Sequence, residues 1–461
     1  MKKLPWLRSL VLLIPLVGCS CLPSGGGERL IAFVDVSVLP MDRERILRHQ
    51  TVVVQNQRII AMADKDSIDL VADAIRVDGR GRYLMPGLAD MHVHLLEEED
   101  FILFLANGVT TIRDMWGEYP WSLDWRRRIE EGELLGPRIY AAGPVIDGPW
   151  PGAEEERDRM VILDDPKFAF DVVAAQAERG YDFIKVLSHL SPESYTALAS
   201  ASSYFNIPMV GHVPYQVGIA TVLESGQRSI EHLEGYNFAL MSDNAPSIDI
   251  ENRAAWLLPW EYFDASKLET LARATAQAGI WNVPTLVIVV NGRILPEEVE
   301  EKLLQPELRY IVPYNLDYWA GREYISEESR IAKETDRYRK QTVKALSDAG
   351  AGLLLGTDTQ QFFTVPGFSI HEELEHFVDA GLSTFEALRA GTSSPAEFLG
   401  AEEEFGTIKT GMIADLILLN ENPLENISNT KLRVGVMVRG EWFPEKQLKR
   451  MLEQVAEGYE K

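Results

Sequence analysis

The 461-residue sequence has only two cysteines, Cys19 and Cys21, and both lie near its start. This scarcity excludes a disulfide-held scaffold and a zinc site built from cysteine thiolates. Positive charge is also scarce, because 45 basic against 70 acidic side chains give a formal net charge of −25. A field of that sign repels phosphate groups, so we expect no nucleic-acid partner. Hydrophobic residues at 46% and charged residues at 25% exclude wholesale disorder.

The first residues form a targeting segment. A basic start is followed by the apolar run Leu10–Val17, which is too short to span a bilayer. Leu16-Val17-Gly18-Cys19 resembles a bacterial lipobox, in which cleavage before Cys19 precedes lipidation of its thiol. We therefore expect a lipoprotein signal peptide at 1–18, a flexible tether at 19–28, and export to the bacterial cell envelope with a membrane anchor at Cys19. The alternative is an ordinary signal peptide with coincidental cysteines.

Short β-branched runs separated by turn signals occur at both ends of the chain. Thr51-Val52-Val53-Val54 is an example near the start, and Leu416-Ile417-Leu418-Leu419 is one near the end. Neither half could bury its apolar face alone. We therefore expect residues 29–85 and 402–461 to form one composite β-sandwich domain.

Between these ends, residues 86–401 alternate apolar strands with helical patterns, which is typical of parallel βα units. The predicted strands are Leu88–Leu95, Val109–Met115, Arg138–Gly143, Asp182–Ser188, Ile207–Val213, Arg228–Leu233, Val283–Val289 and Gly352–Thr359. The predicted helices include Phe168–Arg179, Ser194–Ser203, Ser266–Ala278 and Arg330–Ala349. The pattern predicts an α/β protein with a (β/α)8 TIM-like barrel. A doubly wound sheet is the alternative, although a dinucleotide-binding G-x-G-x-x-G is lacking.

Candidate metal ligands lie at the ends of these predicted strands. They are His92 and His94 on the first strand, Lys185 on the fourth, His212 on the fifth, His232 on the sixth and Asp358 on the eighth. His92 and His94 share a face because side chains alternate along a strand. Singly, Lys185 could be a buried structural lysine and Asp358 a helix cap. Together they predict one site, because barrel enzymes place their active sites at the carboxyl ends of the strands.

These residues carry a family resemblance. Pro86-Gly87-Leu88-Ala89-Asp90-Met91-His92-Val93-His94, Ser229-Ile230-Glu231-His232 and Leu355-Gly356-Thr357-Asp358 resemble motifs of the amidohydrolase superfamily of metal-dependent hydrolases. Gly411-Met412-Ile413-Ala414-Asp415-Leu416-Ile417-Leu418-Leu419 is similar to its closing β-sandwich segment. Phe183-Ile184-Lys185-Val186, followed by Gly211-His212, resembles the imidazolonepropionase-related branch. That branch includes Xaa-Pro dipeptidases and an ochratoxin-cleaving amidase.

The resemblance implies two divalent metal ions, with zinc expected. His92, His94 and Asp358 would hold the more buried ion, and His212 and His232 the outer one. Lys185 would bridge both after carbon dioxide has converted its side chain to a carbamate. Neutral imidazole and carboxylate are good zinc ligands, and an apolar strand neighbourhood lowers the pKa of a lysine.

The implied activity is hydrolysis of an amide bond in a small molecule or short peptide, such as a dipeptide or an N-acyl amino acid. A hydroxide bridging the metals would attack, and Asp358 would act as general base and then as general acid. The same metals could instead serve hydrolysis of cyclic amides, lactones or phosphotriesters. A non-catalytic envelope lipoprotein and a nucleobase deaminase are further alternatives, although a bridging lysine is typical of the hydrolytic members.

Candidate substrate contacts follow the strands. The resemblance implies a carboxylate-binding tyrosine shortly after the fifth-strand histidine, but here Pro214 displaces it by one place, to Tyr215. His189 and Tyr236 lie on other loops that we expect to face the site, or else to be solvated at its rim.

Other residues of these loops have structural interpretations. Arg113 and Asp114 are expected to form a structural ion pair, and His371 to cap a helix or support the site. Tryptophans crowd the loops after the second and third strands and around the seventh; they are Trp116, Trp121, Trp125, Trp150, Trp256, Trp260, Trp281 and Trp319. They predict either an aromatic entrance for an apolar substrate or packing, including a contact in a homo-oligomer.

Overall fold

The computed structural model describes residues 30–117, 121–250 and 254–459. The predicted signal peptide at 1–18, Cys19 and the tether at 19–28 lie outside these residues. Within the described ranges, no helix combines the length and the apolar character needed to cross a membrane.

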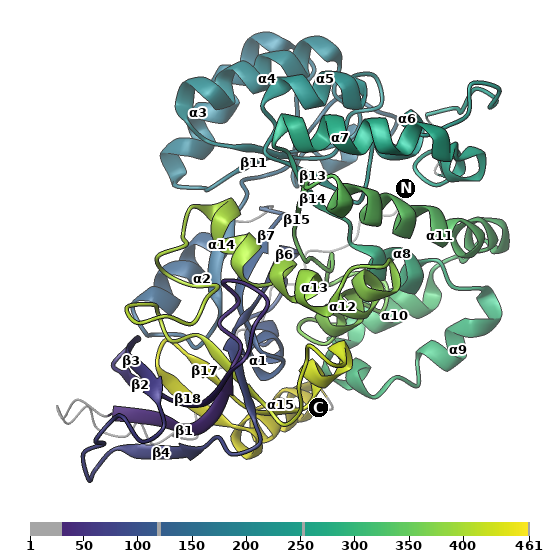
Figure 1. The fold of residues 1–461 in the computed structure, drawn as a ribbon. Helices are drawn as coiled ribbons and strands as arrows, with labels where there is room; N and C mark the ends of the chain where they lie inside the picture. Colours follow the sequence, from purple (N-terminus) through teal and green to yellow (C-terminus); the bar gives the residue numbers. More distant parts are fainter. Residues whose placement is uncertain (1–29, 118–120, 251–253, 460–461) are drawn as a thin grey trace.

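An eight-stranded sheet brings the two ends of the chain together, seen in Figure 1 as purple strands beside yellow ones. Its strands are β1 (Leu30–Val38), β2 (Leu47–Gln55), β3 (Arg58–Asp64), β4 (Ile75–Asp78), β5 (Tyr83–Pro86), β16 (Leu416–Leu419), β17 (Arg433–Val438) and β18 (Glu441–Pro444). The joint is the antiparallel pairing of β5 with β16. Buried side chains of both ends, among them Phe33, Val52 and Leu418, share one core, so each half supplies the apolar face that the other lacks.

The middle of the chain forms a closed barrel. Its strands are β6 (Leu88–Val93), β7 (Val109–Asp114), β8 (Arg138–Ala141), β11 (Ile184–Val186), β12 (Met209–Gly211), β13 (Ser229–Glu231), β14 (Trp281–Val283) and β15 (Gly352–Leu353). β6 to β8 pair in parallel in one group, and β11 to β15 in another. Parallel bridges from Val93 to Thr359 and from Ala142 to Phe183 join the two groups at both edges. The predicted fold class, a (β/α)8 barrel with a β-sandwich domain built from both chain ends, is confirmed.

Helices surround the barrel (Figure 1). They include α1 (Asp100–Ala106), α2 (Trp121–Glu130), α3 (Ala169–Arg179), α4 (Pro192–Phe205), α5 (Gly218–Ser225), α7 (Leu268–Ala278), α11 (Ser326–Asp348), α12 (Ser369–Asp379), α13 (Thr384–Ala390) and α14 (Ser393–Leu399). The helices predicted from the sequence correspond to α3, α4, α7 and α11. Local signals set their ends: Ser191 caps α4 by accepting from the Ser194 N–H, and Asn206 ends it in a left-handed conformation.

The remaining elements lie in the loops and at the C-terminus. They are β9 (Ile146–Asp147), β10 (Val161–Ile162), α6 (Tyr236–Ala239), α8 (Leu286–Gly292), α9 (Val299–Lys302), α10 (Pro313–Gly321) and α15 (Glu445–Tyr459). β9 and β10 extend the sheet beside β11. α15 packs against α1 and β17, next to the sheet that joins the chain ends.

The predicted seventh strand, Val283–Val289, is wrong over most of its length. β14 ends at Val283, and the apolar run that follows it forms α8. The buried Glu373 carboxylate of α12 accepts the N–H groups of Leu286 and Val287 at 2.9 and 2.7 Å and so starts the helix. β-branched residues favour a strand locally, but this distant cap overrides that preference.

Candidate metal centre and active site

The predicted metal-binding side chains all line one cavity of about 300 Å³. They are His92, His94, Lys185, His212, His232 and Asp358. Each lies on its predicted strand or directly after it, so the cavity opens at the carboxyl ends of the barrel strands, where barrel enzymes place their chemistry. The rest of the lining is Trp116, Leu187, Glu234, Trp256, Ile288, Val289, Arg293, Gln361 and Phe362.

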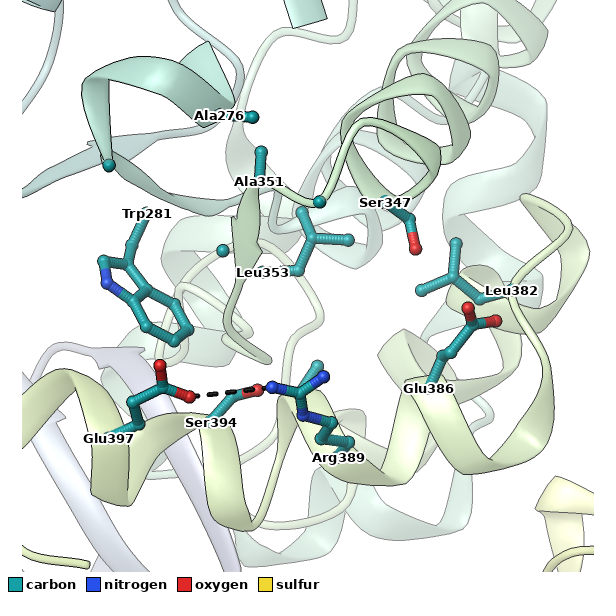
Figure 2. A pocket seen from close by; sticks show the side chains of 14 residues that line it. Ala276, Trp281, Ser347, Ala351, Leu353, Leu382, Glu386, Arg389, Ser394 and Glu397 are labelled. Carbon is teal, nitrogen blue, oxygen red and sulfur yellow. Dashed lines mark ion pairs between the residues drawn. The ribbon is translucent and has the colours of Figure 1, made fainter. Parts of the chain in front are cut away.

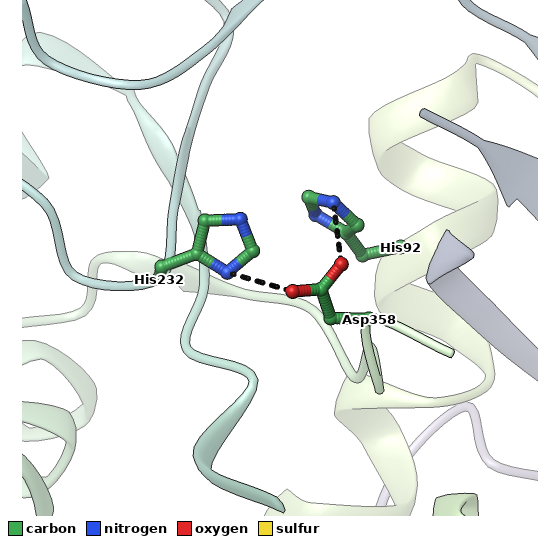
Figure 3. A group of neighbouring side chains, drawn as sticks. All are labelled: His92, His232 and Asp358. Atoms are coloured by element: carbon green, nitrogen blue, oxygen red, sulfur yellow. Dashed lines mark ion pairs between the residues drawn. The ribbon is translucent and has the colours of Figure 1, made fainter. Parts of the chain in front are cut away.

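The Asp358 carboxylate lies between imidazoles, as Figure 3 shows for His92 and His232. Ligand atoms of His92, His232 and Asp358 all lie within 4.8 Å of one another. One Asp358 oxygen is 2.6 Å from His94 Nε2 and 3.5 Å from His92 Nε2. The rings of His212 and His232 meet edge to face, with centroids 5.1 Å apart. The fold therefore gathers four imidazoles and a carboxylate from four different strands.

The backbone at this cluster adopts conformations that non-glycine residues rarely take. His232, Asp358 and Thr285 have φ angles of 60°, 59° and 47°. Gly211, directly before His212, has φ 129°, and a Cβ there would lie 2.2 Å from the Val186 carbonyl oxygen. Such conformations cost free energy and cluster at functional sites.

Hydrogen-bonding partners at Nδ1 orient three of the histidine rings. Nδ1 of His92 contacts Glu231 Oε2 at 2.8 Å, Nδ1 of His212 contacts Ser188 Oγ at 2.8 Å, and Nδ1 of His232 contacts Thr285 Oγ1 at 2.7 Å. These contacts leave Nε2 of each ring for another ligand. Nε2 of His92 is buried and has no hydrogen-bond partner among the described residues. A lone buried nitrogen is costly, whereas zinc ligation through Nε2 with a carboxylate on Nδ1 is a common arrangement, so the donor set fits a divalent metal.

The pKa shifts of the cavity residues are consistent with metal binding. Burial lowers the pKa of His232 to about 4, so its imidazole is neutral near pH 7. Burial alone raises the pKa of Asp358, but His232, His94 and Lys185 outweigh it, so the pKa lies below its ordinary value. Burial also lowers the pKa of Lys185 to about 8. Lys185 is buried and lines the cavity, so a larger share of its amine is neutral near pH 7 than for an exposed lysine.

Arg113 does not pair with Asp114, contrary to the prediction. Successive side chains of a strand point to opposite faces, so Arg113 of β7 enters the barrel while Asp114 accepts hydrogen bonds from the Ser122 hydroxyl and the Trp116 N–H. Arg113 donates instead to both Glu231 oxygens, at 3.0 and 3.1 Å. The Arg113 and Glu231 side chains are fully buried, so the pair links the barrel interior to His92.

The predicted substrate contacts lie outside the cavity lining. His189 is held by Asp147, with Nδ1 at 2.8 Å from its carboxylate, and the Tyr215 ring packs against His189 at 5.6 Å. Tyr236 is fully buried, and its hydroxyl donates to Asn282 Oδ1 at 2.8 Å. The structure does not bring these three side chains to the metal cluster.

The tryptophans divide between the site and the core. Trp116 and Trp256 line the cavity, and Trp150 stacks on His189, which lies outside the lining. Trp125, Trp260 and Trp319 are buried in packing clusters. His371 is not among the cavity-lining residues. Its ring contacts the Thr430 hydroxyl, the Arg433 guanidinium and the carbonyl of Asn107, the residue that ends α1.

A second cavity, whose lining Figure 2 shows, has a volume of about 380 Å³. It lies at the amino ends of β14 and β15, opposite the end that holds the metal cluster. Its lining includes Trp281, at the start of β14, and Ala351, just before β15. It also contains the solvent-exposed pair Arg389–Glu397, 3.6 Å apart. No described side chain there belongs to the metal cluster, so we assign the chemistry to the carboxyl end.

A family model and solved structures match this architecture. The model of the amidohydrolase family matches residues 83–443, which is most of the chain. The chain belongs to the amidohydrolase family. Ochratoxinase of Aspergillus niger is 22% identical over 406 residues, covering 75% of this chain and 71% of the relative. Among solved structures, bottromycin amidohydrolase matches with a TM-score of 0.73 at 22% identity, covering 94% of this chain and 91% of that one.

The chain also matches the solved structure of a Xaa-Pro dipeptidase that has methionine bound in its active site. Its TM-score is 0.66 at 19% identity, and the match covers 90% of this chain and 100% of that one. At these identities the likeness to solved structures establishes the fold of the barrel and sheet domain.

Several residues of the site had no role assigned from the sequence. Glu231 directly precedes His232, and alternation along a strand predicts opposite faces for two neighbouring side chains, so the local pattern gave no signal for Glu231. Glu234 lines the cavity and accepts from Ser188 Oγ at 3.0 Å. Although burial raises its pKa, His212 and His232 lower it below the ordinary value. Thr285 carried no signal because it lies in the predicted strand Val283–Val289, and Arg293 follows that strand outside any recognised motif.

Replacing Glu231 with glutamine tests the buried support of His92. Glu231→Gln leaves Arg113 charged, buried and without its carboxylate, so the free energy of unfolding should fall by about 3–5 kcal/mol. Chemical denaturation measures it. The matched control is Glu334→Gln in α11, which breaks an exposed pair with Arg330 and should change stability by less than about 0.5 kcal/mol. Equal stabilities of the two variants would contradict the assignment.

Proposed function

We propose that this protein hydrolyses the amide bond of a dipeptide or an N-acyl amino acid at a centre of two zinc ions. The observation that carries the proposal is the convergence of His92, His94, Lys185, His212, His232 and Asp358 on one cavity. Membership of the amidohydrolase family supports it, as does the similarity to a protein named as a dipeptidase.

The residues divide between the two ions. His92, His94 and Asp358 would hold one ion, and His212 and His232 the other. Lys185 would serve both, once its neutral amine has added to carbon dioxide and released a proton to give a carbamate. Two bound divalent ions acidify a shared water and polarise the substrate carbonyl.

Asp358 carries the proton in this proposal. Its depressed pKa keeps the carboxylate ionised and able to accept a proton from the attacking water. The water oxygen forms the new bond to the carbonyl carbon, the C–N bond breaks, and Asp358 returns the proton to the departing nitrogen. Trp116, Trp256 and Phe362 make part of the cavity wall apolar.

A substrate panel with an Asp358 variant tests the activity. Dipeptides and N-acyl amino acids should turn over, whereas lactones and phosphotriesters should not, and a chelator should abolish turnover until zinc is restored. Asp358→Asn should lower kcat by about 10²–10⁴-fold. The matched control is Asp348→Asn, at the exposed end of α11, which should keep full activity. Turnover of lactones or phosphotriesters alone, or an active Asp358→Asn enzyme, would refute the proposal.

We also propose that the protein is exported and anchored to a membrane of the bacterial cell envelope through lipid on Cys19. The basic start, the apolar run and the lipobox-like sequence support this. In a bacterial host, the wild type should partition into the detergent phase of a Triton X-114 extract. Cys19→Ser should move to the aqueous phase, while the control Cys21→Ser should stay with the detergent. Identical partitioning of the two variants would exclude Cys19 as the anchor.

A further inference from the structure

The cavity contains one permanent cation. Among the described residues that line it, the basic side chains other than histidine are Lys185 and Arg293. In the proposed function Lys185 becomes an anionic carbamate, which leaves Arg293 as the positive charge of the protein in the cavity. The chain as a whole has a formal net charge of −25. The chain as a whole therefore repels an anionic substrate, and a cation placed apart from the proposed metal ions would offset that repulsion at the substrate carboxylate.

The guanidinium of Arg293 is fixed in place before any ligand arrives. It lies over the Trp256 ring at 4.7 Å, its Nε is 3.6 Å from Glu328 Oε2, and its Nη1 donates to the Gly292 carbonyl at 3.2 Å. The side chain is only 14% exposed. A planar guanidinium stacked on an indole loses little freedom when it binds a carboxylate, and its fork matches the two oxygens.

The helix that leads to Arg293 is a rigid support. The Glu373 carboxylate caps the first turn of α8, and Asn291 near its end donates to Glu372 at 3.1 Å. Thr285, just before α8, contacts His232 of the metal cluster. The same short segment therefore positions a proposed metal ligand at one end and Arg293 at the other.

The tyrosine expected to bind the substrate carboxylate does not reach the cavity. The Tyr215 ring packs against His189 and Phe238, with centroids 5.6 and 5.7 Å away. Burial raises the pKa of its phenol. A carboxylate in the cavity must therefore find another partner, and Arg293 is of the right charge and shape.

Apolar side chains form the rest of the wall near this arginine. Ile288 and Val289 of α8, Trp256 under the guanidinium, Phe362 after β15 and Leu187 after β11 all line the cavity. Such a surface binds an apolar side chain or acyl group by the hydrophobic effect.

From this geometry we propose that Arg293 binds the free carboxylate of the substrate. This inference rests on the proposed function. It gives a binding partner to the carboxylate that dipeptides and N-acyl amino acids share, and it narrows the substrates to those with an apolar group, held by α8, Trp256 and Phe362. Neutral amides and carboxamides of the same shape are poor substrates.

A pair of substrates that differ only in the carboxylate tests the inference. The preferred amide of the substrate panel is compared with its decarboxylated counterpart, for example N-benzoylphenylalanine with N-benzoylphenethylamine. The wild type should prefer the carboxylate. Arg293→Gln should raise KM for the carboxylate substrate about 10–100-fold, the effect of losing a charged hydrogen bond, and leave the decarboxylated substrate within about twofold.

Two further variants guard against an indirect effect. Arg293→Gln combined with Glu328→Gln removes both charges of that ion pair, so the loss of discrimination should persist in a chain without an unpaired buried acid. The matched control is Arg322→Gln, because Arg322 lies over Phe362 at 3.8 Å without lining the cavity. This variant should prefer the carboxylate substrate over the decarboxylated one as strongly as the wild type does.

Three outcomes separate the possible failures. Equal losses on both substrates in the Arg293 variants would overturn the proposal and make Arg293 structural. A wild type that cleaves amides without preferring the carboxylate would overturn it while amide hydrolysis stands. A wild type that cleaves no amide would overturn the proposed function itself.

Discussion

The site depends on one buried carboxylate. Glu231 accepts two hydrogen bonds from Arg113 and one from His92, and all three side chains have no exposed area. An unpaired charge in that position would be costly, so the three groups fix one another. Because the same carboxylate holds the His92 ring by Nδ1, the ring presents Nε2 to the Asp358 side of the cavity. The core of the barrel and the geometry of the proposed metal centre are therefore one arrangement.

A second constraint comes from α8, which occupies the place where a longer seventh strand was predicted. β14 contributes three residues to the barrel, and the chain then turns through Thr285 in a left-handed conformation. The buried Glu373 makes this turn possible by capping the helix that follows. Ending the strand early moves Ile288, Val289 and the segment to Arg293 into the cavity wall.

The sequence was sufficient for the features with a local or periodic signal. The H-x-H spacing directs His92 and His94 to one face, and the rule for barrel strand ends brings Lys185, His212 and Asp358 to the same cavity. Contacts between residues far apart in the sequence could not be predicted in this way. Arg113 pairs with Glu231, which is 118 residues away in the sequence. The sequence around Arg113 does not show that this distant carboxylate, and not the neighbouring Asp114, is its partner. Tyr236 follows a predicted strand, as a loop residue would, yet its buried hydroxyl donates a hydrogen bond to Asn282 of β14.

The same limit applies to the seventh strand, where only the fold shows that Glu373 caps α8. The central claim is that six side chains hold two metal ions around an activated water, with Lys185 modified. A crystal structure of zinc-loaded protein, with anomalous scattering measured at the zinc edge, tests it most directly. The account predicts two anomalous peaks among His92, His94, His212, His232 and Asp358, and carbamate density continuous with Lys185 between them. A single peak beside an unmodified Lys185 amine, or peaks elsewhere in the molecule, would contradict it.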